Sequence, residues 1–301
     1  MAGKYEKYVK EIPIHGRIGT MKLGALLEED FFGWDSYSVR YGLIDGTGVI
    51  PEETDKLHTH DYDQILWLLS SDPNDMLELG AEVEVTLGTN NVRHRFRNPH
   101  AILIPKGTPH FSPLVDQLDR PFYFLSVNCT GKLAAEVVDE NAVQGVGGTW
   151  AEFAGAEYNR NVYALHFARK GPYHYGSAVD TDSGGIYAHL NSMSTGGIPL
   201  TMTWQTVTKP HPLGPRKKDM NYYPHAHMEY EESLIFLSLD QGNLTDLHGS
   251  ADFSFGQTDV DQETYTVTKA TAMIQPKGCF HLPLVFTRVD KPMIFITLGK
   301  H

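Results

Sequence analysis

Two stretches of the chain decide the fold: HTHDYDQILWLLS at residues 58–70 and HAHMEYEESLIFLS at residues 225–238. Each begins with two histidines separated by one residue, continues through a polar segment to Gln64 or Glu232, and closes on an apolar run of strand length. Because alternate side chains of a strand share one face, both histidines of a pair project to the same side. The chain therefore carries the same half of a chelate twice.

A second pair of matching stretches follows, AILIPKGTPHFSPLV at 101–115 and AMIQPKGCFHLPLV at 272–285. Each contains Pro-x-Gly-x-x-His, ending in His110 or His281. The proline removes a ladder donor and the glycine permits a positive φ, which predicts a turn before a new strand. The offset is 167 residues at the first block and 171 at the second. The chain is therefore interpreted as a tandem duplication.

The boundary between the two copies is expected near residue 140. The stretch GKLAAEVVDENAVQG at 131–145 has apolar residues spaced for a short helix and is followed by two glycines. We expect an N-terminal domain over 1–140 and a C-terminal domain over 141–301, with short helical linker segments. Elsewhere, short β-favouring runs broken by Gly, Pro, Asn or Asp predict an antiparallel sandwich or barrel.

Three imidazoles and one oxygen donor in each copy form a candidate metal-ligand set. The predicted ligands are His58, His60, Gln64 and His110 in the first copy, and His225, His227, Glu232 and His281 in the second. Such a set suits Fe, Mn, Co, Ni, Cu or Zn, and the absence of thiolates disfavours a structural zinc-finger site. We expect catalytic divalent transition metals, up to two per chain.

Two alternatives concern the second copy. A one-residue slip in strand register would send Glu232 to the opposite face and make Glu231 the ligand. Glu232 is preferred because it and Gln64 precede apolar runs of equal length. Cys279 lies two residues before His281, but a buried cysteine is more often a small apolar filler than a ligand.

The difference between Gln64 and Glu232 predicts two unequal sites. Three imidazoles and a carboxylate reduce the charge of a divalent ion to +1, whereas three imidazoles and a carboxamide leave it at +2. The Gln64 site is the stronger Lewis acid and should hold an anionic substrate or hydroxide more tightly. Glu232 could act as a general base if it leaves the metal. Either copy could instead have degenerated to a purely structural barrel.

These motifs resemble those of the cupin superfamily, and the chain is similar to a bicupin. The second copy matches both family motifs, and the first departs from them only at Gln64, where the family usually has glutamate. The resemblance implies an all-β fold of two tandem cupin double-stranded β-barrels, or jelly rolls, with metal in each lumen. Storage cupins usually lose the motif histidines, whereas all six motif histidines are present here. Their presence disfavours a metal-free binding or storage protein.

Composition excludes several classes of protein. Hydrophobic residues make up 41% and charged residues 21% of the 301 residues, as in ordinary globular proteins. A formal charge of −12 disfavours nucleic acid and anionic membranes as partners. No apolar run has the length of a membrane span, the two cysteines cannot form a disulfide framework, and the start lacks a secretory apolar stretch. A cytoplasmic location is expected.

The first functional hypothesis is a bicupin oxidoreductase of the dioxygenase type, with iron as the first choice of metal. It would act on a small oxygenated substrate of enediol, diketone or catechol type that chelates the ion. A non-redox isomerase, cyclase or decarboxylase is the alternative, because metal identity decides the reaction class. Small-molecule substrates are the expected partners; bicupins occur as monomers and larger assemblies, so a homo-oligomer is compatible with the sequence.

Overall fold

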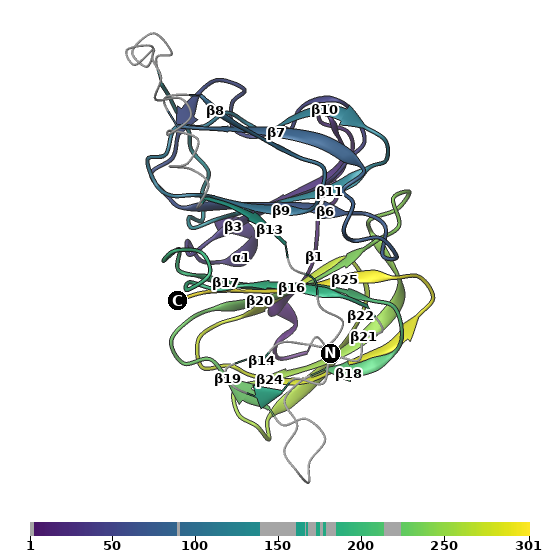
Figure 1. The fold of residues 1–301 in the computed structure, drawn as a ribbon. Helices are drawn as coiled ribbons and strands as arrows, with labels where there is room; N and C mark the ends of the chain where they lie inside the picture. Colours follow the sequence, from purple (N-terminus) through teal and green to yellow (C-terminus); the bar gives the residue numbers. More distant parts are fainter. Residues whose placement is uncertain are drawn as a thin grey trace. The chain divides into compact units, whose positions relative to one another are not determined.

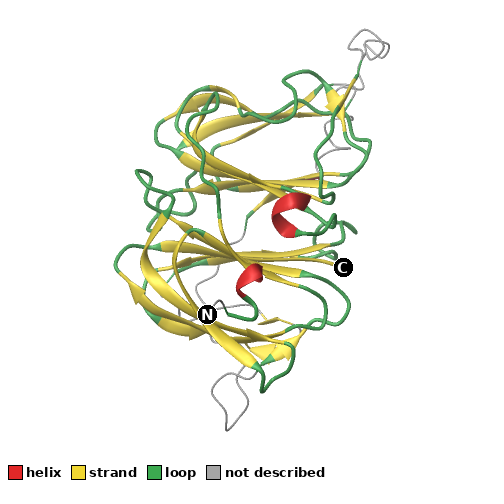
Figure 2. Ribbon diagram, turned by 180° about the vertical axis from the view of Figure 1, so that it is seen from behind, coloured by secondary structure: helices red, strands yellow, loops and turns green. Residues whose placement is uncertain are grey.

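The computed structural model describes residues 3–88, 91–138, 161–165, 167, 173–174, 177–178, 185–213 and 224–301. Strands dominate this part of the chain, and its helical elements are the single turns η1 (Glu6–Tyr8) and α1 (Glu29–Phe32) (Figure 2). Among the described residues, no helix has the length and hydropathy required to cross a membrane. By contact, the chain divides into one compact unit of residues 13–165 and another of residues 1–12 with 166–301.

The unit of residues 13–165 is built around a six-stranded antiparallel sheet. Its strands, in spatial order, are β13 (Val162–Ala164), β9 (His100–Ile104), β6 (Gln64–Ser70), β11 (Phe122–Asn128), β3 (Ser38–Ile44) and β2 (Met21–Leu27) (Figure 1). A smaller sheet contains β4 (Gly48–Val49), β10 (Leu114–Leu118), β7 (Ala81–Leu87) and β8 (Val92–Phe96). The strand β5 (His58–Thr59) pairs separately with β12 (Glu136–Val137).

The other unit repeats this plan. Its six-stranded sheet runs β1 (Val9–Glu11), β23 (Thr271–Gln275), β20 (Glu232–Ser238), β25 (Met293–Lys300), β17 (Leu200–Val207) and β16 (Tyr187–Leu190). Its second sheet contains β18 (His211–Leu213), β24 (Phe280–Val289), β21 (Asp246–Gly256) and β22 (Gln262–Lys269), with β19 (His225–Ala226) paired to β24. A separate hairpin joins β14 (Tyr173–His174) to β15 (Ser177–Ala178).

The register of the central strands confirms the duplication. Gln64 lies opposite Ile104, and Glu232 lies opposite Gln275, at the corresponding positions of the two sheets. The two copies therefore share both strand order and residue-level alignment. This is the all-β architecture of two tandem cupin units that the repeated motifs predict.

The sequence limits of the two units differ from the single boundary expected at residue 140. The strand β1, near the start of the chain, pairs with β23 of the later copy, and Ile12 N–H donates to the carbonyl of Ala270. The strand β13, which follows the expected boundary, pairs with β9 of the earlier copy. Each six-stranded sheet is thus completed by a strand from outside its own repeat. Three-residue strands carry no periodic signal, so sequence patterns could not reveal this arrangement.

The prediction of a linker helix over 131–145 is wrong for residues 131–138, the part that the structure describes. Residues 136–137 form β12, which pairs with β5, and Val138 N–H donates to the carbonyl of Leu57. Hydrogen bonding to the neighbouring strand has overridden the local helical spacing. The remaining residues of the expected helix, 139–145, lie outside the described residues.

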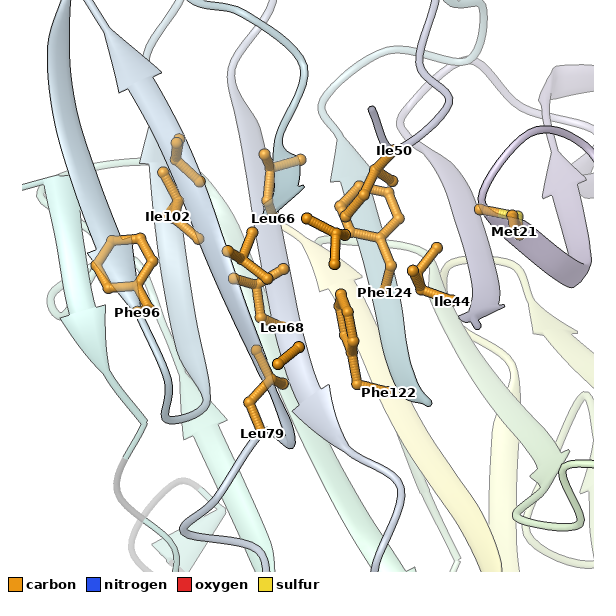
Figure 3. Close-up of a cluster of buried hydrophobic side chains, with 14 of the residues drawn as sticks. Met21, Ile44, Ile50, Leu66, Leu68, Leu79, Phe96, Ile102, Phe122 and Phe124 are labelled. Carbon is orange, nitrogen blue, oxygen red and sulfur yellow. The ribbon is translucent and has the colours of Figure 1, made fainter. Parts of the chain in front are cut away.

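The core of the 13–165 unit lies between its sheets. Leu66 and Leu68 of β6 alternate with residues on the other face, and both are fully buried beside Phe122 and Phe124 of β11 (Figure 3). The corresponding alternate residues of β20, Leu234 among them, lie in the core of the second unit. The side chains on one face of each central strand therefore point into the lumen between the sheets.

Replacing Phe124 with alanine should destabilise this unit by about 3–5 kcal/mol, because the side chain is fully buried and its removal leaves a cavity. The measurement is urea unfolding of the full-length protein followed by tryptophan fluorescence. The exposed Leu77 is the matched control, since Leu77→Ala removes an apolar side chain that is mostly in solvent. Equal losses in the two variants would contradict the assigned core.

Candidate metal centres

The first centre brings His58, His60 and His110 together. The backbones of His58 and His110 exchange two hydrogen bonds, of 3.0 and 2.9 Å, so their side chains meet across the strands. His60 lies two residues after His58 and shares its face. One ring nitrogen from each of the three histidines lies within 4.8 Å of the others. The two sequence motifs thus converge on one point.

The turn after Pro105 links the motifs. Gly107 has φ of 76°, in the left-handed region that glycine adopts readily, and its N–H donates to the carbonyl of His60 at 2.8 Å. Gly278 repeats both features, with φ of 76° and a 2.8 Å bond to the carbonyl of His227. The glycine of each Pro-x-Gly-x-x-His motif therefore fixes the third histidine relative to the first two.

Backbone carbonyls set the ring orientation of the three histidines in the first centre. Each Nδ1 lies 2.7–2.9 Å from a carbonyl oxygen and must donate its proton there. The acceptors for His58, His60 and His110 are, in order, Lys56, Ala134 and Thr108. The lone pair of each neutral ring is consequently on Nε2. All three Nε2 atoms are buried and have no hydrogen-bond partner among the described residues.

Burial keeps these rings neutral. It lowers the pKa of His110 to about 3, with the neighbouring His58 adding to the effect, and it also lowers the pKa of His60. A neutral imidazole is the form that binds a metal ion. The cluster therefore fits a divalent ion, since its three converging lone pairs meet no hydrogen-bond donor in the described part of the chain.

Stripping the protein of metal should make its stability fall with decreasing pH. The unfolded chain takes up a proton on His110 near the ordinary pKa of about 6.5, while the folded site resists until about pH 3. Stability is lost through this interval, by about 2 kcal/mol between pH 7 and pH 5. Urea unfolding of the protein in a metal chelator, at pH 7 and at pH 5, measures this loss of stability. His110→Leu should lose this part of the dependence, and an unchanged dependence would contradict it.

Gln64 is the oxygen donor that the sequence predicts for the first centre. It opens β6 on the face that also carries Leu66 and Leu68 and is therefore directed to the lumen. Its Nε2 donates to Glu52 Oε1 at 3.1 Å and to Ser126 Oγ at 3.2 Å. Its Oε1 is buried without a hydrogen-bond partner in the described part of the chain.

Glu52 is a residue that the sequence reasoning missed. Burial, followed by the adjacent Glu53, raises its pKa to about 7, while Glu53 pairs with the Arg40 guanidinium at 2.9 Å. The only sequence signal is a pair of glutamates six residues before the first motif. Loop carboxylates are normally solvated, so nothing in the pattern indicated a buried contact with Gln64.

The second centre repeats the cluster with a carboxylate. His225 lies opposite His281 in the pairing of β19 with β24, and one nitrogen from each of these and His227 lies within 4.8 Å of the others. Glu232 Oε2 is 3.4 Å from Nε2 of His227 and 3.3 Å from Nε2 of His281. Glu231 instead lies 3.6 Å from the ammonium of Lys277. The strand register thus favours Glu232 over Glu231.

The walls of the two centres differ beyond the carboxylate. Gln275, directly opposite Glu232, is buried, and neither polar atom of its amide has a hydrogen-bond partner within the described residues. Its counterpart in the first unit is Ile104, a hydrocarbon. Sequence reasoning missed Gln275 because only its place opposite Glu232 distinguishes it. Cys279, weighed above as a ligand, is half-buried and outside the cluster of converging atoms.

No family model matches the chain, and no curated protein matches it in sequence. Solved structures do match in fold. An oxalate decarboxylase of Bacillus subtilis, studied for its Mn(II) centres, has a TM-score of 0.60 at 12% identity, over 97% of this chain and 76% of that chain. An oxalate decarboxylase of Lactobacillus farciminis in a formate complex has a TM-score of 0.60 at 12% identity, over 97% and 86%. The chain has the bicupin fold.

Proposed function

We propose that this protein is a metal-dependent decarboxylase of a small carboxylic acid that carries a second oxygen donor on the adjacent carbon. The supporting observation is the convergence of three buried Nε2 lone pairs in the first centre. The buried amide oxygen of Gln64, on the lumen face of β6, is the proposed fourth acceptor. Four acceptors without a donor are costly to bury unless a cation binds them. A divalent ion of the transition series satisfies this donor set.

The similar structures support decarboxylation over the dioxygenase that was the first hypothesis from sequence. They are oxalate decarboxylases, and one is described by its Mn(II) centres. Manganese therefore replaces iron as the first choice of metal. Oxalate itself belongs to the proposed substrate class, since its two carboxylates lie on adjacent carbons and can chelate one ion.

The bound ion would supply positive charge next to the carbon–carbon bond that breaks, which stabilises developing negative charge on the substrate oxygens. In the reaction, the carbon–carbon bond breaks, carbon dioxide leaves, and the remaining carbon takes up one proton. His58, His60 and His110 would hold the ion through their Nε2 atoms, and the amide oxygen of Gln64 would be its oxygen ligand. The apolar wall at Leu66 and Ile104 excludes water from the lumen, which strengthens these electrostatic interactions.

The first centre is the proposed site for an anionic substrate. A carboxamide ligand leaves the full +2 charge of the ion available to a dianion, whereas Glu232 neutralises half of it in the second centre. The proposed role of the second centre is to bind a metal ion whose net charge is lowered to +1 by Glu232, which lies close to two of its histidines.

Elemental analysis of the purified protein, followed by gas measurements, tests this proposal. The panel contains oxalate, pyruvate, an acyclic β-diketone and a catechol, each assayed for carbon dioxide release and oxygen uptake. Bound manganese with carbon dioxide release and no net oxygen uptake supports the proposal. Oxygen consumed in proportion to product would favour the dioxygenase, and a protein that binds no metal when supplied with it would overturn both.

A further inference from the structure

The amide nitrogen of Gln64 has both of its hydrogens engaged. One is donated to Glu52 Oε1 and the other to Ser126 Oγ. The hydroxyl of Ser126 donates its hydrogen to Asn128 Oδ1 at 3.0 Å, so the Ser126 oxygen can only accept from Gln64. Two acceptors therefore surround the nitrogen end of the amide.

A flipped amide is disfavoured at this position. It would direct the carbonyl oxygen of Gln64 at Ser126 Oγ, whose hydrogen is donated to Asn128, and at Glu52, which offers only lone pairs in its ionised form. The hydrogen bond to Ser126 would become a repulsive contact, and so would the bond to an ionised Glu52, inside a buried region where each unmet polar group is costly. The observed orientation leaves the oxygen as the free end of the amide.

We infer that Glu52 is a positioning residue for the first metal centre, which with Ser126 orients the Gln64 amide so that its oxygen is presented to the ion. The inference rests on the metal binding proposed above. A carboxylate ligand has two equivalent oxygens and needs no such device, but only one end of a carboxamide can bind a cation.

The second unit lacks this arrangement where the two can be compared. Asn128, which fixes the Ser126 hydroxyl, lies opposite Gln64, and the residue opposite Glu232 is Gly299, which has no side chain. The asparagine that fixes Ser126 beside the carboxamide therefore has no side chain as its counterpart opposite the carboxylate. Glu52 can serve as an acceptor whether or not it carries a proton, because its Oε1 keeps a lone pair in both forms.

The test uses the full-length chain carrying His225→Ala and His227→Ala, so that only the first centre binds metal. Co(II) is titrated into this parent, into Glu52→Leu and into Glu52→Gln, and its visible absorption spectrum reports the ligand set. Glu52→Leu removes one acceptor and should weaken Co(II) affinity about 10–100-fold and alter the spectrum. Glu52→Gln keeps an acceptor oxygen and should stay within about threefold of the parent.

Ser126→Ala is the second variant and removes the other acceptor with little change in volume. It should also weaken Co(II) binding, and it carries the test if Glu52→Leu does not fold. Urea unfolding of the metal-free proteins separates a general loss of stability from a loss of metal affinity. Parent-like affinity and spectrum in both Glu52→Leu and Ser126→Ala would overturn the positioning role and leave the proposed function intact.

The remaining outcomes are also decisive. A Glu52→Gln variant as weak as Glu52→Leu would overturn positioning, because the charge of Glu52 rather than its acceptor would then matter. A parent that binds no Co(II) at all would overturn the proposed metal centre itself. The failure of the inference and the failure of the proposed function therefore give different results.

Discussion

Replacing His225 and His227 with alanine should halve the metal content of the protein, from about two ions per chain to about one. Each substitution removes one of the three nitrogens that converge in the second centre, and two ligands are too few to hold a divalent ion firmly. The first centre is assembled from other strands and keeps its ligands. Elemental analysis after dialysis against trace metal measures the result.

The reciprocal variant, His58→Ala with His60→Ala, should leave the other ion bound and abolish the proposed decarboxylation. His100 provides a matched control, because it is also a buried histidine with its Nδ1 on a backbone carbonyl, but it packs on Phe96 outside either cluster. His100→Ala should keep the full metal content. Complete retention of metal in either double variant would contradict the assignment of that centre.

Replacing Gln64 with glutamate should weaken the binding of oxalate and azide to the first centre by about tenfold or more. The added carboxylate lowers the charge of a divalent site from +2 to +1, and an elementary charge at about 4 Å is worth up to about 4 kcal/mol at an effective dielectric constant of 20. The variant also sets a second carboxylate beside Glu52, which accepts from Gln64 at 3.1 Å in the native protein.

That neighbour complicates the measurement, so Gln64→Glu is compared with and without Glu52→Gln. Calorimetric titration of the manganese-loaded protein with oxalate should show the loss of affinity in both backgrounds. Glu232→Gln in the second centre makes the opposite change and should strengthen anion binding there. Oxalate affinity that is unchanged by both Gln64→Glu and Glu232→Gln would refute the charge argument.

The fold was predictable because its determinants are local and repeated. The histidine pairs, the Pro-x-Gly turns and the apolar runs recur in the same order, and alternation along β6 and β20 explains which residues face the core. The converging histidines follow from the same motifs. Their positions required no knowledge of distant loops, since the N–H groups of Gly107 and Gly278 bond each turn to the second histidine of the His-x-His pair.

The missed features depend on contacts between distant segments. The carbonyl of Ala134, which orients His60, comes from a segment 74 residues away that was expected to be helical. Glu52 reaches Gln64 only because its loop folds over the end of β6. Strand pairing at the sheet edges was equally invisible, since Val9–Glu11 is too short to show a period. Local patterns do not encode such partners.

Because β1 pairs with β23 and β13 pairs with β9, the chain cannot be divided at its midpoint without breaking both pairings. Residues 13–165 form one unit that is continuous in sequence, and the other unit takes its residues from before and after that segment. Gene fission at the midpoint would strip a border strand from each half and expose backbone groups that template aggregation. A dissection that keeps every strand pair must instead excise residues 13–165 whole and rejoin the two flanking segments, because the first unit is inserted within the sequence of the second.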